Sequence, residues 1–159
     1  MRILIISDTH RRIDHFQDLI ERMKPIDLLV HCGDAEMEAD FFEYLAGCPV
    51  EMISGNNDFF LDLPREKEFY IGDYKVWLTH GHNYYVSMGN EILKEEAASR
   101  GVDIVIYGHT HKPVIDRKSA VTAINPGSLS YPSQEVRKPS YIMMELDREG
   151  KAHYHINYV

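Results

Sequence analysis

The chain has 159 residues, of which 25 are Asp or Glu and 17 are Lys or Arg, so its formal net charge is −8. A chain of this length buries about two thirds of the surface that its unfolded form exposes, and it folds without disulfides or partners. The apolar fraction of 44% and the charged fraction of 26% exclude fibrous and disordered classes. The negative charge disfavours long-range attraction to nucleic acid polymers and to anionic membranes. We therefore expect one domain, residues 1–159, that does not bind a membrane.

The two cysteines, Cys32 and Cys48, lie in apolar surroundings and lack the spacing of a thiolate metal site. This cysteine usage is typical of proteins in a reducing compartment. The first apolar run, residues 3–6, is too short for a signal peptide or a membrane span. We expect a cytoplasmic protein.

The N-terminal part of the chain alternates short apolar runs with segments of helical periodicity. The apolar runs predict strands at residues 2–6, 26–30 and 50–53, and the periodic segments predict helices at 13–23 and through 41–45. This βαβαβ order is typical of parallel strands, because each crossover needs a connection as long as a helix.

The rest of the chain is predicted to be richer in β-structure. Residues 67–71 and 74–78 predict a β-hairpin, since Gly72 supplies a turn conformation that other residues resist. A helix is predicted near residues 87–100, and further strands at 102–107, 114–117, 121–124, 140–146 and 152–159. Some strands come as βαβ units and others as hairpins, so we expect an α/β fold of two sheets covered by helices.

Polar side chains gather where the predicted strands end. Seven that could bind a metal follow these strands: Asp8, His10, Asp34, Asn56, His80, His109 and His111. In open α/β sheets the loops at the carboxyl ends of the strands meet at one crevice. We therefore expect these seven side chains to share a site.

The side-chain types suggest which ion such a site would hold. Carboxylates, imidazoles and a carboxamide favour divalent first-row metals such as Mn, Fe, Co, Ni or Zn. Residues two apart in extended backbone point to the same side, so Asp8 with His10, and His109 with His111, can each chelate an ion. Two ions about 3.5–4 Å apart need a bridging ligand, for which the carboxylate of Asp34 is a natural candidate. Taken singly, an Asp or Asn beside Gly is more often a turn former, and only the constellation favours a metal centre.

The motifs around these residues resemble the five motifs of the calcineurin-like metallophosphoesterases: Asp8-x-His10, Gly33-Asp34, Gly55-Asn56-x-Asp58, His80-Gly-His82 and Gly108-His109-x-His111. The resemblance spans most of the chain. The short length and the later Asn125-Pro-Gly-Ser128 make the chain most similar to the small bacterial and archaeal phosphodiesterases of that superfamily. The resemblance implies a four-layer fold, a two-sheet β-sandwich flanked by helices.

The resemblance also implies a dinuclear centre with two divalent ions per chain, Mn before Ni, Fe, Co or Zn. One ion would be bound by Asp8, His10, Asp34 and His111, and the other by Asp34, Asn56, His80 and His109. The implied activity is that of a metal-dependent phosphodiesterase acting on small phosphate esters. In such an enzyme the two cations polarise the phosphoryl group and a metal-bound hydroxide attacks phosphorus in line.

One position departs from the family pattern. Many members carry His directly after the motif Asn, where it is thought to protonate the leaving group, and this chain has Asn57 there. An amide cannot serve as an acid near neutral pH, so Asn57 either hydrogen-bonds a phosphoryl oxygen or is a loop residue with left-handed backbone. His82 is a second catalytic candidate, as an acid or a substrate contact, or else it is a histidine at the rim of the site. Asp58 and His31 are expected to support the ligands rather than bind the metal.

Two other functions are alternatives to a phosphodiesterase that acts on small phosphate esters. A retromer subunit uses the family's fold but lacks part of the metal set, so a non-catalytic metal-binding scaffold is one alternative. A metal-dependent nuclease is the other, and it would need a basic groove for the polymer. The nearest basic clusters are only the pairs Arg11-Arg12 and Arg137-Lys138.

The expected partner is thus a small phosphate-ester substrate. The aromatic residues Phe59, Phe60, Tyr84 and Tyr85 suit either a substrate pocket or a subunit contact, so a homo-oligomer stays open.

Overall fold

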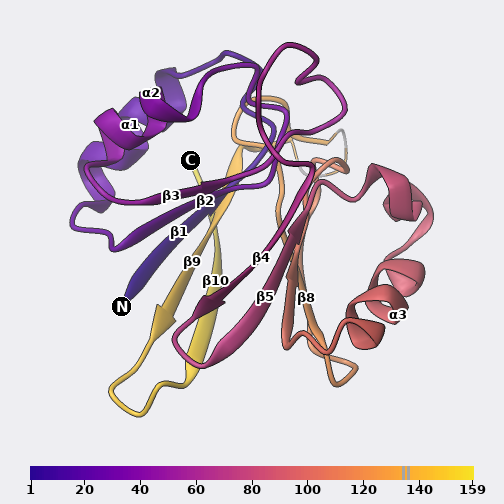
Figure 1. Cartoon of the computed structure of the whole chain (residues 1–159). Helices are drawn as coiled ribbons and strands as arrows, with labels where there is room; N and C mark the ends of the chain where they lie inside the picture. Colours follow the sequence, from indigo (N-terminus) through magenta and orange to yellow (C-terminus); the bar gives the residue numbers. More distant parts are fainter. Residues whose placement is uncertain (134, 136) are drawn as a thin grey trace.

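Figure 1 shows the computed structural model, which describes residues 1–133, 135 and 137–159. These residues form two five-stranded sheets that lie face to face, and three α-helices that cover the outer faces. The strand order is β10-β9-β1-β2-β3 in the first sheet and β4-β5-β6-β8-β7 in the second. The α/β sandwich of two sheets flanked by helices is therefore confirmed.

The first sheet contains β1 (Arg2–Ile6), β2 (Leu28–His31), β3 (Val50–Met52), β9 (Ser140–Leu146) and β10 (Ala152–Tyr158). The helices α1 (Asp14–Met23) and α2 (Ala39–Ala46) connect β1 to β2 and β2 to β3, and these three strands are parallel. The strand β9 pairs antiparallel with both β1 and β10. The loops after β1, β2 and β3 consequently leave the sheet at the same edge.

The second sheet contains β4 (Glu66–Ile71), β5 (Tyr74–Thr79), β6 (Ile104–Ile106), β7 (Pro113–Asp116) and β8 (Thr122–Pro126). The strands β4 and β5 form the predicted hairpin, and Gly72 in its turn has a φ of 57°. The strands β5, β6 and β8 are parallel, whereas β7 is antiparallel to β8. Both sheets are thus mixed.

The helix predicted for residues 87–100 is shorter than expected. The helix α3 covers only Glu91–Ser99, and Val86–Met88 forms a separate 3-10 helix. Gly89 lies between them with a φ of 131°, a conformation that interrupts the helical backbone. None of the helices in the described part of the chain has the length and apolar character that a membrane span requires.

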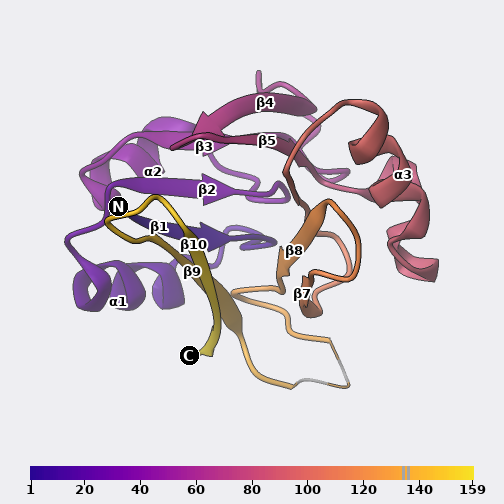
Figure 2. The same ribbon diagram turned by 90° about the horizontal axis from the view of Figure 1, so that it is seen from below.

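Among the described residues, three apolar clusters hold the layers together. Side chains such as Ile5 and Ile106 are fully buried between the sheets. The helices α1 and α2 pack on the first sheet, where the rings of Phe16 and Phe42 lie 5.1 Å apart. The helix α3 packs on the second sheet through Leu93. Figure 2 shows α1 and α3 on opposite sides of the molecule, which leaves the carboxyl ends of the central strands for the connecting loops.

Candidate metal centre

The side chains expected to bind metal come from both sheets. Loops after β1, β2 and β3 carry Asp8, His10, Asp34 and Asn56, and loops after β5 and β6 carry His80, His109 and His111. The site therefore lies where the loops of the two sheets meet.

Asp8, His10 and His111 form one group of ligand atoms that all lie within 4.8 Å of one another. The Nε2 atom of His111 is 3.2 Å from Asp8 Oδ1, and the Nε2 atom of His10 is 3.8 Å from the same oxygen. Asp8 is fully buried, whereas the two histidines are half-buried. An ion in this group would be reached from the surface.

Asp8, Asp34 and His80 form a second such group, and all three side chains are buried. The Nε2 atom of His80 is 3.4 Å from Asp34 Oδ2 and 3.8 Å from Asp8 Oδ1. The same oxygen of Asp34 lies 3.9 Å from His10 Nε2. The carboxylate of Asp34 thus lies between His80 and His10, within reach of both groups.

Asn56 and His109 contact each other beside these groups. The Nδ1 atom of His109 lies 3.2 Å from Asn56 Oδ1, and its ring lies 5.2 Å from the ring of His80. His109 does not belong to either of the two groups of mutually close ligand atoms. The structure therefore brings both residues to the site but pairs them with each other.

Two atoms of the candidate metal ligands are buried without a hydrogen-bond partner, namely Asp8 Oδ1 and His80 Nε2. Leaving a buried polar atom unpaired costs about 1–3 kcal/mol, and more for a charged group. The other carboxylate oxygen of Asp8 is satisfied, because Ser7 Oγ donates to it at 2.5 Å and the backbone N–H of His109 at 3.2 Å. A divalent cation would satisfy both orphaned atoms, so the donor set fits a metal ion.

Three of the candidate ligands, His10, His80 and His111, each have their Nδ1 atom within hydrogen-bond distance of an oxygen atom. His80 Nδ1 lies 2.7 Å from the carbonyl oxygen of Cys32, and His111 Nδ1 lies 2.5 Å from that of Tyr131. A carbonyl oxygen only accepts hydrogen bonds, so each Nδ1 carries the proton and each Nε2 keeps a lone pair in the neutral ring. His10 Nδ1 lies 2.9 Å from Glu36 Oε1 in the same manner. Histidines held in this way are typical metal ligands.

The backbone that carries the ligands is left-handed rather than extended. Positive φ angles occur at Asp8 (54°), His10 (46°), Asp34 (55°), His109 (70°) and His111 (58°). The expectation that extended backbone aims each Asp-x-His and His-x-His pair is therefore wrong. Such conformations cost of order 1–3 kcal/mol each and persist where the surroundings determine them, commonly at functional sites.

Two glycines allow the loops to approach each other closely. A Cβ atom on Gly55 would lie 2.1 Å from Asp34 Oδ1, and one on Gly108 would lie 2.1 Å from Ser7 Oγ. Both distances are far below van der Waals contact. The glycines of the Gly-Asn and Gly-His motifs are therefore required by the packing around the two aspartates.

Asn57 contacts Asp34 twice. Its backbone N–H donates to Asp34 Oδ1 at 2.8 Å, and its Nδ2 donates to Asp34 Oδ2 at 2.7 Å. Its φ is not positive, so the alternative of a left-handed loop residue is wrong. Asn57 is exposed, and its amide holds the carboxylate of Asp34 in orientation.

His82 lies beside the ligand groups. Its ring lies 5.5 Å from that of His80 and 6.0 Å from that of His109, and its Nδ1 is buried without a partner. Burial lowers the pKa of His82. The imidazole is consequently neutral near pH 7.

Supporting residues surround the ligands. His31 is fully buried, its Nδ1 accepts the N–H of Gly33 at 3.2 Å, and its Nε2 lies 3.0 Å from Thr9 Oγ1. Glu36 supports His10 through the contact between Glu36 Oε1 and His10 Nδ1. The sequence analysis does not single out this residue, although its place two residues after Asp34 is a usable signal. The carbonyl groups that hold His80 and His111 had no sequence signal, because every residue has a carbonyl.

The charged groups of the site shift one another's pKa values. Burial acts to raise the pKa of Asp34, but the contact with His80 and the hydrogen bonds from Asn57 outweigh it, so this pKa is lowered. Burial likewise acts to raise the pKa of Asp8, and the contacts with His111 and His80 lower it. Both carboxylates are therefore ionised at neutral pH and attract cations.

The profile of the calcineurin-like phosphoesterase superfamily domain matches residues 1–149, and the chain belongs to this family. It is 31% identical over 151 residues to the probable metallophosphoesterase YsnB of Bacillus subtilis (strain 168), covering 94% of this chain and 87% of that protein. It is also 31% identical over 145 residues to the phosphodiesterase MJ0936 of Methanocaldococcus jannaschii, covering 80% of this chain and 83% of that protein. The predicted membership in the small bacterial and archaeal branch is thus confirmed.

Solved structures agree with this assignment. One described as a novel archaeal phosphodiesterase has a TM-score of 0.79 and 27% identity and covers 100% of both chains. Vps29 from Entamoeba histolytica, solved in complex with Zn²⁺, has a TM-score of 0.77 and 21% identity and covers 99% of both chains. At that identity the likeness to Vps29 shows the fold alone.

Proposed function

We propose that the chain is a phosphodiesterase that hydrolyses small phosphate esters at a dinuclear metal centre, and that it acts as one domain of residues 1–159. Family membership already makes it a metal-dependent phosphoesterase. The observation that carries the finer proposal is the pair of orphaned buried atoms, Asp8 Oδ1 and His80 Nε2, 3.8 Å apart. The relative named as a phosphodiesterase supports diesters as the substrate class.

In this proposal the ligands divide around Asp34. One ion is held by Asp8, His10, Asp34 and His111, and the other by Asp34, Asn56, His80 and His109. The distances of Asp34 Oδ2 from His10 Nε2, 3.9 Å, and from His80 Nε2, 3.4 Å, support Asp34 as the bridge. Bound Mn²⁺, or Fe, Co, Ni or Zn, would polarise the phosphoryl group and lower the pKa of water.

The chain's own residues would orient the ligands and the substrate. The two hydrogen bonds from Asn57 to Asp34 hold the proposed bridging carboxylate in one orientation. His82 would contact the substrate, because its half-buried ring lies beside the rings of His80 and His109. Because burial lowers the pKa of His82, we propose that it donates or accepts a hydrogen bond as a neutral ring.

A cytoplasmic location completes the proposal, since Cys32 and Cys48 are free thiols, which a reducing compartment maintains. The scaffold alternative gains little support, because the likeness to Vps29 shows only a shared fold. The nuclease alternative would need a basic groove, which a chain of net charge −8 does not favour.

The test is reconstitution of metal-stripped protein with single metals. We expect stripped protein to be folded by circular dichroism and inactive, and Mn²⁺ to restore hydrolysis of bis(p-nitrophenyl) phosphate above that of p-nitrophenyl phosphate. Elemental analysis should give two ions per active chain. Protein that binds two ions but turns over neither ester with any of the five metals would instead be a scaffold.

A further inference from the structure

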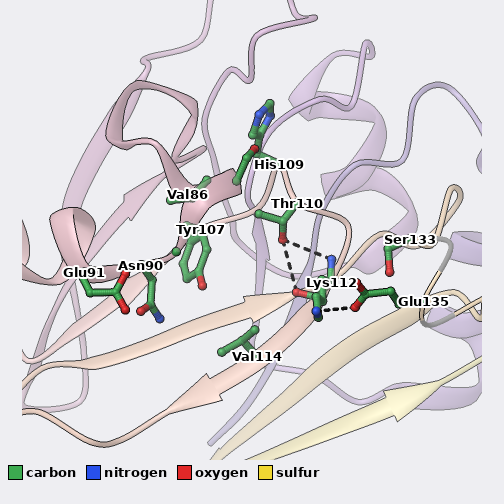
Figure 3. Close-up of a pocket in the computed structure, with 12 residues that line it drawn as sticks. Val86, Asn90, Glu91, Tyr107, His109, Thr110, Lys112, Val114, Ser133 and Glu135 are labelled. Atoms are coloured by element: carbon green, nitrogen blue, oxygen red, sulfur yellow. Dashed lines mark hydrogen bonds and ion pairs between the residues drawn. The ribbon is translucent and has the colours of Figure 1, made fainter.

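A pocket of about 670 Å³ adjoins the candidate metal centre, and His109 lines it. Figure 3 shows Asn90, Glu91 and Tyr107 on one side of this pocket, Lys112 and Glu135 on the other, and His109 at its rim. Binding sites for small molecules usually have volumes of about 300–1,000 Å³. The pocket is therefore large enough for a nucleoside.

Neutral hydrogen-bonding groups line much of the pocket. They are the hydroxyl groups of Tyr107 and Thr110 and the amide of Asn90, with the apolar side chains of Val86 and Val114 between them. Asn90 Nδ2 donates to Asp116 Oδ2 at 3.0 Å, which fixes the amide and leaves its carbonyl oxygen available. This combination suits a ligand with hydroxyl groups and a flat or apolar face.

The charges of the lining disfavour a second anionic group on the ligand. Lys112 Nζ is paired with Glu135 Oε2 at 2.5 Å, so the cation of the described lining already has a carboxylate partner. Glu91 adds a further carboxylate. An uncharged ligand would meet no repulsion there.

We propose that this pocket binds the alcohol portion of a phosphodiester, and that this portion is an uncharged group of nucleoside size. The inference rests on the proposed function and adds to it the class of alcohol. The phosphate reaches the metal centre past His109, while Tyr107 and Asn90 hydrogen-bond the hydroxyl groups of the alcohol.

The experiment compares two diesters that share the leaving group p-nitrophenolate, thymidine 5′-(p-nitrophenyl phosphate) and methyl p-nitrophenyl phosphate. In both, water adds to phosphorus, the bond from phosphorus to the p-nitrophenolate oxygen breaks, and a monoester of the other alcohol remains. With the Mn²⁺-reconstituted protein we expect kcat/KM to be about tenfold or more higher for the thymidine ester, since pocket contacts discriminate by such factors.

Two variants test whether the pocket causes this preference. Val114→Trp fills the pocket and should abolish the preference by raising KM for the thymidine ester alone. Asn90→Ala removes one polar partner and should reduce the preference several-fold. The control is Ile92→Trp, on the half-exposed Ile92, which does not line this pocket.

Binding of thymidine 5′-monophosphate to Mn²⁺-loaded protein, measured by calorimetry, provides a readout besides turnover. We expect Val114→Trp to weaken it about tenfold and Ile92→Trp to leave it unchanged. Equal kcat/KM for the two diesters in the unaltered protein, or equal losses for both in Val114→Trp, would overturn the pocket inference and leave the phosphodiesterase proposal intact. If neither diester is cleaved with any metal, the proposed function fails, whereas pocket-dependent binding of the nucleotide would still support the pocket as a nucleoside site.

Discussion

The carboxylate of Asp58 holds the backbone of Asp34 in place, because Asp58 Oδ2 accepts the N–H of Asp34 at 2.7 Å. The same carboxylate accepts the N–H of Glu36 at 2.6 Å and that of Gly55 at 2.7 Å. Asp58 is buried. A single side chain therefore joins the loop after β2 to the loop after β3 and positions ligand candidates on both.

Asp58→Ala should weaken Mn²⁺ binding by about 10–100-fold, the usual effect of removing a group that orients metal ligands. It should also lower the free energy of unfolding by about 2 kcal/mol or more, because buried N–H groups lose their acceptor. Metal titration and urea denaturation measure the two effects. Asp62→Ala, at an exposed carboxylate in the same loop, is the matched control and should change neither. Unchanged metal affinity in Asp58→Ala would show that the loops hold their ligands without it.

Asp34→Ala should abolish activity and release both ions, because it removes the proposed bridge. Asn56→Ala should chiefly weaken one site and leave about one ion per chain. Elemental analysis after gel filtration measures the ion content of each variant. Two ions and near-normal turnover in Asp34→Ala would disprove the bridging role.

The residue at position 57 should determine whether the protein hydrolyses phosphomonoesters or phosphodiesters faster. A monoester with a poor leaving group gains most from a protonated donor, which contributes about 10²–10⁴-fold where it is present. Asn57 cannot be such a donor, so activated diesters should be cleaved faster than matching monoesters, and Asn57→His should raise monoester turnover more than diester turnover.

Asn57→Ala is the control for that experiment, because it removes the side-chain hydrogen bond to Asp34 without adding an acid. It should lower turnover of both ester classes alike. A preference of the unaltered protein for alkyl monoesters, lost in His82→Ala, would identify His82 as the donor instead.

His31 should make the metal-free protein less stable as the pH falls. Burial lowers the pKa of His31 to about 4 in the folded protein, against about 6.5 when unfolded. Below pH 6.5 the unfolded chain therefore binds a proton that the folded chain does not, and stability declines until the pH reaches about 4. Across this window the contribution of His31 should fall by about 3 kcal/mol.

The measurement compares the free energy of unfolding of chelator-treated protein with that of His31→Gln between pH 7 and pH 4. Since both proteins share all other titrating groups, their difference isolates His31. Parallel pH profiles for the two proteins would show that His31 does not titrate in this window.

Much of the fold could be predicted from the sequence because its signals are local. Apolar runs such as residues 2–6 became strands, and Gly72 marked the turn of the β4–β5 hairpin. The start of α3 was misplaced because the apolar spacing continues across Gly89, whose φ of 131° breaks the helix.

The site was partly predictable for the same reason. Polar residues after strands identified the ligand candidates, whereas the left-handed backbone at Asp8 and His109 depends on close contacts between distant loops. The carbonyl group that orients His80 belongs to Cys32, 48 residues away in sequence. The pocket beside His109 likewise joins residues around Asn90 to residues around Lys112, which no local pattern reports.

The ligand candidates are divided between loops of the two sheets, so a bound ion would connect the two halves of the sandwich. Asp8 and Asp34 belong to loops of the first sheet, and His80 and His111 to loops of the second. An ion held by both sets would act as a crosslink and would resist sliding of one sheet over the other. Conversely, a substitution that creates a cavity deep between the sheets, far from any ligand, would shift the ligands of one sheet relative to those of the other. The affinity for the ion would then fall. Metal affinity in this protein should thus report how well the two sheets are packed.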